Sequence, residues 1–144
     1  MATRWDALLP VFALAAALIG HTVAARADLI TGCASEVSQF CTDVTQGRGR
    51  LSACLAGHMN QLGSGCLPEV QAVARSPLVP GDVRKIFNPA FRAALPQACV
   101  TPAAQFCPGV PAGDGRVFAC LYARSDRVGK ACTAAARATL KAAK

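Results

Sequence analysis

Apolar residues recur every three or four positions in two stretches of the chain, which is the spacing of one face of an α-helix. The first stretch begins near Arg50 and the second near Arg116. Their apolar stripes consist of Leu51, Cys54, Leu55, Met59 and Leu62, and of Val117, Cys120, Leu121 and Val128. A glycine follows each stripe, Gly63 or Gly129, and a third helix is expected after it. No segment alternates apolar and polar residues for the length of a strand, so the pattern predicts an all-α fold.

The two stretches are parts of a repeated unit. GRGRLSACL at 47–55 and GDGRVFACL at 113–121 are identical at six of nine positions. The cysteines stand at intervals of 8, 13 and 12 in both units, and the second set follows the first by 66 positions. The two sets are Cys33, Cys41, Cys54 and Cys66, and Cys99, Cys107, Cys120 and Cys132. The sequence therefore predicts two tandem repeats of about three short helices each.

Each repeat is expected to open with a short helix that ends near its second cysteine. Ser35 or Thr101 is placed to cap this helix. Residues 42–49, with two glycines, and residues 108–115, with Gly and Pro, predict loops. Asp114 is placed to cap the helix that follows the second loop.

The segment between the repeats is predicted to be structured. In the first repeat the third helix is expected to begin late, near Pro68. Residues 77–81 predict a turn, and a short helix over about 89–95 is expected to pack Phe91 against a neighbouring repeat. Such a linker is too structured for a flexible tether, which favours docked repeats over independent ones.

An even number of cysteines at repeated spacings predicts a disulfide framework. Metal binding and thioredoxin-like chemistry are disfavoured, because the chain contains no CxxC pair. Two cysteines eight residues apart on one helix would lie about 12 Å apart, beyond the limit of about 7 Å for a bridge. Folding the chain back through the loop favours Cys33–Cys66, Cys41–Cys54, Cys99–Cys132 and Cys107–Cys120. Pairing of the first cysteine with the third and the second with the fourth remains the alternative.

The start of the chain has the pattern of a secretory signal peptide. Arg4 precedes an apolar run over 7–20, and Ala25-Arg26-Ala27 provides the small residues of a cleavage site. An uncleaved anchor is the alternative, but the run of about 14 residues is shorter than the roughly 20 that span a bilayer. We expect a periplasmic or secreted protein with no transmembrane segment after cleavage. The expected parts are a signal peptide at 1–27, repeats at 28–75 and 99–144, and a linker at 76–98.

The cysteine pattern carries a family resemblance. Both repeats share the spacing C-x7-C-x12-C-x11-C, FC at the second cysteine, G-x-G-R before the third and CL at the third. This resembles the cysteine-rich repeat family of Golgi apparatus protein 1, also called the cysteine-rich fibroblast growth factor receptor. Over about 33–75 and 99–141 the chain looks like a small bacterial secreted member with two repeats. The resemblance implies an all-helical, disulfide-bonded module that binds secreted proteins, and it supplies no catalytic residue.

Positive charge is concentrated in the second repeat and its tail, which hold seven basic residues against two acidic ones. Arg137, Lys141 and Lys144 fall at helical steps and form one basic edge. This edge is either a solvated face or a surface that attracts an anionic envelope component or an acidic protein. Arg50 and Arg116 recur before the third cysteine. Each either hydrogen-bonds loop carbonyls of its own repeat or binds a ligand carboxylate or sulfate.

No catalytic residue, cofactor or metal site is predicted. His58 is interpreted as an exposed surface histidine, because the second repeat has Arg124 in the same place. Glu36, Asp43 and Glu69 have no partner at a spacing suited to acid–base catalysis.

These patterns predict a non-catalytic binding or structural module of the cell envelope. Its partner would be a secreted or envelope protein or an anionic envelope component. Nucleic acid is excluded, because the chain is predicted to be exported and its aromatic residues do not alternate with basic ones. One alternative is an envelope or stress factor that binds anionic membranes through the basic C-terminal helix. A periplasmic enzyme is the weaker alternative.

Overall fold

The computed structural model describes residues 31–143 apart from 78, 89 and 114, and this part of the chain contains helices and no strand. The predicted all-α fold is thereby confirmed. In chain order the elements are η1 (Thr31–Cys33), α1 (Ala34–Phe40), α2 (Arg50–Gly57), η2 (Met59–Gln61), α3 (Cys66–Arg75), α4 (Gly81–Arg84), η3 (Lys85–Phe87), η4 (Gln97–Cys99), α5 (Val100–Phe106), α6 (Arg116–Ala123) and α7 (Lys130–Ala142). The helices α1, α2 and α3 of the first repeat correspond to α5, α6 and α7 of the second. The predicted signal peptide lies outside the described residues.

Four disulfides join the helices, two within each repeat. They link Cys33 to Cys66, Cys41 to Cys54, Cys99 to Cys132 and Cys107 to Cys120. The first bridge of each repeat ties the start of its first helix to its third helix, with Cα atoms 4.6 and 4.7 Å apart. The second ties the end of the first helix to the second helix, with Cα atoms 6.1 and 6.0 Å apart. These are the pairs that the sequence favours, and the alternative connectivity does not occur.

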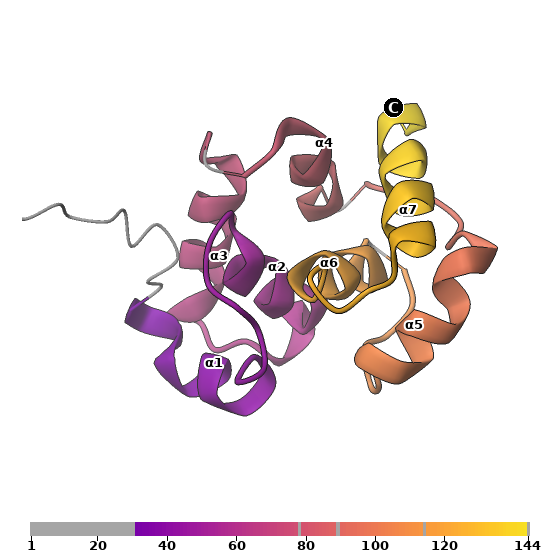
Figure 1. The fold of residues 1–144 in the computed structure, drawn as a ribbon. Coiled ribbons are helices and arrows are strands. Elements are labelled where there is room, and N and C mark those ends of the chain that lie inside the picture. Colours follow the sequence, from indigo (N-terminus) through magenta and orange to yellow (C-terminus); the bar gives the residue numbers. More distant parts are fainter. Residues whose placement is uncertain (1–30, 78, 89, 114, 144) are drawn as a thin grey trace, which may run out of the picture.

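The two repeats pack against each other through α2 and α6, which lie side by side at the centre of the molecule (Figure 1). Every residue of α2 from Leu51 to Gly57 is buried. Gly57 allows the close approach, because a Cβ atom there would lie 3.4 Å from the Arg116 carbonyl oxygen and 3.5 Å from the Cys120 Cβ. The remaining helices cover the outer sides of this pair, with α3 beyond α2 and α7 beyond α6 (Figure 1).

The linker differs from its prediction. The predicted turn at 77–81 leads directly into the short helix α4, which was not predicted and begins at Gly81 after Pro80. The predicted helix at 89–95 is wrong, because the described residues 90–95 are not helical. Phe91 is nevertheless buried, and its ring meets that of Phe118 edge to face with centroids 5.6 Å apart. Burial of this ring against α6, rather than helix formation, sets the path of the chain.

The first helix of each repeat begins earlier than predicted. α1 and α5 start directly after Cys33 and Cys99, and neither has a side-chain cap. Ser35 and Thr101 lie inside these helices, so the predicted caps are wrong. The bridge from each of these cysteines to the third helix holds the first turn in place without a cap.

The third helix of the first repeat begins at Cys66 rather than near Pro68. Pro68 lies in its first turn, where the missing backbone N–H is tolerated. Gly115, with φ of 71°, occupies the cap position of α6, and the predicted cap Asp114 is outside the described residues. No helix in the described ranges has the length and apolar content needed to cross a membrane.

Candidate functional site

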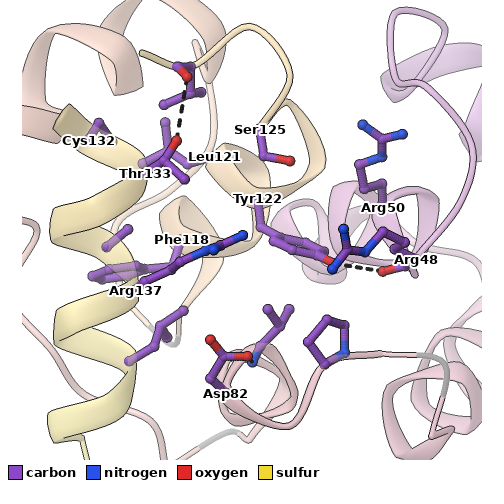
Figure 2. A pocket seen from close by; sticks show the side chains of 15 residues that line it. Arg48, Arg50, Asp82, Phe118, Leu121, Tyr122, Ser125, Cys132, Thr133 and Arg137 are labelled. Carbon is purple, nitrogen blue, oxygen red and sulfur yellow. Dashed lines mark hydrogen bonds between the residues drawn. The ribbon is translucent and has the colours of Figure 1, made fainter. Parts of the chain in front are cut away.

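A pocket of about 350 Å³ lies where the two repeats and the linker meet (Figure 2). Its apolar walls come from α6, α4 and α7, and include Phe118, Leu121, Val83 and Leu140. These four side chains are almost completely buried. The loop before α2 closes the other side with polar groups. The volume is at the lower end of the range for small-molecule sites.

Arg48 reaches this pocket from a tight turn in the first repeat. The Arg50 N–H donates to the Gly47 carbonyl at 3.1 Å, which closes the turn. Arg48 and Gly49 lie between them with φ of 57° and 74°. Arg48 is the single non-glycine residue with positive φ in the described ranges. A left-handed conformation costs a residue with a Cβ about 1–2 kcal/mol.

The second repeat holds the backbone of Arg48 in place. The Tyr122 hydroxyl of α6 donates a hydrogen bond of 2.7 Å to the Arg48 carbonyl oxygen (Figure 2). The same aromatic side chain also lines the pocket. The turn that presents Arg48 is therefore fixed by the docking of the two repeats.

Arg137 extends into the pocket from α7, on the side opposite to Arg48. Figure 2 shows its guanidinium group and that of Arg48 extending toward one another across Tyr122. Within the described part of the chain, neither guanidinium forms a hydrogen bond or an ion pair. Asp82 of α4 lies at the lower edge of the pocket in Figure 2. One of its carboxylate oxygens accepts the Val83 N–H at 3.0 Å. Two cations that have no partner among the described residues, and one carboxylate, thus surround an apolar cavity.

Arg50 also lines the pocket, but its charge is occupied elsewhere. Its Nη2 donates to the Gln46 carbonyl oxygen at 3.2 Å, and its Nη1 lies 3.6 Å from the Asp126 carboxylate. A hydrogen bond from the Thr45 hydroxyl is the main reason that the pKa of Asp126 lies below its usual value, and the charge of Arg50 adds to the effect. Arg50 therefore ties its own loop to the second repeat.

Arg116, the counterpart of Arg50, does not line the pocket. It donates to the carbonyl oxygens of Pro111 at 3.3 Å and Ala112 at 2.9 Å. Both recurring arginines thus bond loop carbonyls of their own repeat. Lys141 is exposed on α7 outside the pocket, and Lys144 is not among the described residues.

The acidic residues considered for catalysis hold the backbone in place. The Glu36 carboxylate accepts the Ser35 hydroxyl at 2.6 Å and the Gly63 N–H at 3.0 Å. These two bonds, the first more than the second, lower the pKa of Glu36. Glu69 accepts the Gly32 N–H at 3.1 Å. Each carboxylate joins two segments of the first repeat, and none faces the pocket.

Asp43 binds two arginines of the second repeat. Arg124 donates to both of its carboxylate oxygens, and Arg127 also pairs with it. Partial burial acts to raise the pKa of Asp43, but the hydrogen bonds and charges of the two arginines outweigh this effect and lower the pKa. Asp43 is therefore an ionised anchor between the repeats.

His58 is half-buried rather than exposed, so the prediction for this side chain is wrong. Its ring stacks on Phe40 with centroids 4.4 Å apart, and its Nδ1 lies 2.9 Å from the Gln61 side-chain oxygen. The apolar face of Phe40 accounts for the burial. In the described residues no cluster of His, Cys, Asp or Glu has the arrangement of a metal site.

Among the polar residues of the pocket, Arg48, Asp82 and Tyr122 were not predicted as site residues from the sequence. Arg48 carries a signal that could have identified it, because the second repeat has Asp114 at the equivalent place in the G-x-G-R motif. Asp is common in left-handed turn positions and Arg is not. Asp82 and Tyr122 carry no such signal, since their role depends on how the linker and the repeats pack.

One comparison with known proteins gives a match. The family model for a cysteine-rich repeat matches residues 17–63, which include the first three cysteines and the G-R-G-R turn. No curated protein and no solved structure matches the chain. The match relates the first repeat to that family, and the second repeat is related to the first by its shared cysteine spacing and fold.

Proposed function

We propose that the protein is an exported, non-catalytic member of the cysteine-rich repeat family that binds an anionic partner between its two repeats. The observation that carries this proposal is the pair of guanidinium groups, Arg48 and Arg137, which face one pocket from different repeats without partners among the described residues. Arginine is the side chain best suited to binding carboxylate and phosphate groups.

The disulfide framework supports export. All eight cysteines are bonded, and structural disulfides persist in oxidising compartments such as the periplasm or the cell exterior. The sequence pattern of residues 1–27 agrees with a cleaved signal peptide. The two-repeat arrangement agrees with a small bacterial secreted member of the family.

The chemistry of the pocket supports binding rather than catalysis. Arginine side chains stay protonated at physiological pH, so Arg48 and Arg137 can hold an anion but cannot exchange a proton with it. Among the described residues that line the pocket, Asp82 is the one carboxylate, and no histidine or lysine accompanies it. The bridged cysteines cannot act as nucleophiles.

Affinity capture from an envelope extract tests this function with two charge-matched double variants. The pocket variant Arg48→Gln with Arg137→Gln removes both facing cations. The control variant Lys130→Gln with Lys141→Gln removes two exposed cations of α7 outside the pocket. We expect the same partner to be retained by the wild type and the control, and lost by the pocket variant. Equal retention by all three proteins would contradict the proposal.

The exposed cations of α7 support a second candidate function, electrostatic binding to anionic membranes. Lys130, Arg137 and Lys141 are exposed, whereas Leu140 and Cys132 are buried against the protein. The helix therefore has no free apolar face for insertion, and membrane binding would depend on charge and salt. Sedimentation with vesicles containing phosphatidylglycerol tests it. Loss of binding in the control variant as well as in the pocket variant would favour this second function.

A further inference from the structure

We propose that the pocket binds a small amphipathic carboxylate, with its carboxylate held between Arg48 and Arg137 and its apolar part against α6 and α7. This inference rests on the proposed function and names the class of ligand. The ligand would be a monoanion with an aromatic or branched aliphatic group.

The walls of the pocket select the apolar part. Phe118, Leu121 and Leu140 line one side, each at most 5% exposed. Phe118 and Leu140 belong to one hydrophobic core and Leu121 to the other, which fixes their positions, so the cavity exists before a ligand enters. Removing apolar ligand surface from water stabilises the complex by about 25 cal/mol per Å² of buried area. An inorganic anion alone would gain nothing from these walls.

The charges of the pocket select the anionic head. Arg48 and Arg137 contribute two positive charges that no described residue neutralises, while Asp82 contributes one negative charge, so these three side chains have a net charge of +1. Arg50 adds nothing to this sum, because it faces Asp126. A net charge of +1 matches a carboxylate better than a phosphate monoester, which carries nearly two negative charges. The planar guanidinium group also matches the two oxygens of a carboxylate.

The conformation of Arg48 supports a role for its side chain in binding. Its φ of 57° is strained for any residue with a Cβ, and Gly, Asn or Asp would fit the turn at lower cost. Strained residues cluster at functional sites. The strain therefore indicates that the guanidinium group of Arg48 has a function, because Gly, Asn or Asp could not supply this group at the position.

Titration calorimetry with four probes tests the ligand class on the mature protein. The probes are 3-phenylpropanoate, acetate, 3-phenylpropan-1-ol and 2-phenylethyl phosphate. Acetate lacks the apolar part, the alcohol lacks the charge, and the phosphate carries a second charge. We expect 3-phenylpropanoate to bind at least tenfold more tightly than acetate or the alcohol, and more tightly than the phosphate.

Single variants locate the binding. Arg48→Gln and Arg137→Gln should each weaken 3-phenylpropanoate binding at least tenfold, while Lys130→Gln and Lys141→Gln should change it less than twofold. Asp82→Asn should strengthen it several-fold, because it removes a negative charge at the pocket edge. Equal affinity for the alcohol, tighter binding of the phosphate, or equal losses in pocket and control variants would overturn the inference.

The two proposals can fail separately. If none of the four probes binds but envelope capture still requires Arg48 and Arg137, the ligand class is wrong and the proposed function stands. If neither experiment depends on these arginines, both are wrong.

Discussion

Arg124 of the second repeat donates two hydrogen bonds to the carboxylate of Asp43 in the first repeat. Its Nε donates to one oxygen at 3.1 Å and its Nη2 to the other at 2.9 Å. Nη2 also donates to the Phe40 carbonyl oxygen at 3.3 Å, and Nη1 lies 3.3 Å from the Cys120 sulfur. Arg124 is 7% exposed. This side chain therefore joins the two repeats through polar contacts, beside the apolar contact of α2 with α6.

Replacing Arg124 with alanine should lower the free energy of unfolding by about 2–3 kcal/mol. The change leaves Asp43 and the Phe40 carbonyl without a buried donor, which is costly even though Asp43 is partly exposed. Urea unfolding with the disulfides intact measures the effect. Arg127→Ala serves as the control, because its side chain is 42% exposed and should contribute less than about 1 kcal/mol. Equal losses in the two variants would show that Arg124 has no special role.

Stability should decrease at acidic pH through protonation of Asp43. The pKa of this carboxyl is lowered in the folded protein, so the unfolded state takes up its proton first as the pH falls. The contribution is complete well above the unfolded pKa of about 3.9 and is lost as the pH falls through the lower, folded pKa. The difference between the unfolding free energies at pH 6 and at pH 3 measures the loss of stability. This difference should be smaller in the Asp43→Asn variant. An unchanged difference in the variant would assign the acid sensitivity to other groups.

Replacing Arg48 with glycine should separate stability from binding. Glycine relieves the strain at φ of 57° but adds freedom to the unfolded chain, so the free energy of unfolding should stay the same or rise by up to about 1 kcal/mol. Binding of 3-phenylpropanoate should nevertheless be lost with the guanidinium group. Thermal unfolding and calorimetry on one preparation check both results.

The neighbouring glycine provides the control for Arg48. Gly49→Ala places a Cβ at φ of 74° and only 2.6 Å from a methyl carbon of Val79. This variant should be destabilised by more than 1 kcal/mol. If Arg48→Gly were destabilised to the same extent as Gly49→Ala, the strain at Arg48 would not be real.

Non-reducing peptide mapping should recover four bridges, each within one repeat. In the chain-entropy account, removing Cys33–Cys66 should cost about 4 kcal/mol and removing Cys41–Cys54 about 3 kcal/mol, because the first closes a loop of 33 residues and the second a loop of 13. Paired Cys→Ser variants compared by urea unfolding test this order. Any bridge between 33–66 and 99–132 in the map would refute the connectivity.

The sequence predicted the features that depend on local spacing. The cysteine intervals and the apolar stripes were sufficient for the helices, the repeat and the favoured pairing of Cys41 with Cys54. The start of α1 was misplaced, because the disulfide at Cys33, rather than a capping side chain, fixes it. The pocket was not predicted, since Arg48 and Arg137 stand far apart in sequence and meet only after the repeats dock.

The disulfides form nested loops, because Cys41–Cys54 lies inside Cys33–Cys66 and the second repeat follows the same plan. All eight cysteines are used in this way, so the peptide backbone of the linker is the only covalent connection between two cross-linked halves. After a single proteolytic cut in the linker, only noncovalent contacts would hold the two halves together. The pocket would then form only when the two fragments associate. Its occupancy would then depend on protein concentration, although each half would stay covalently closed.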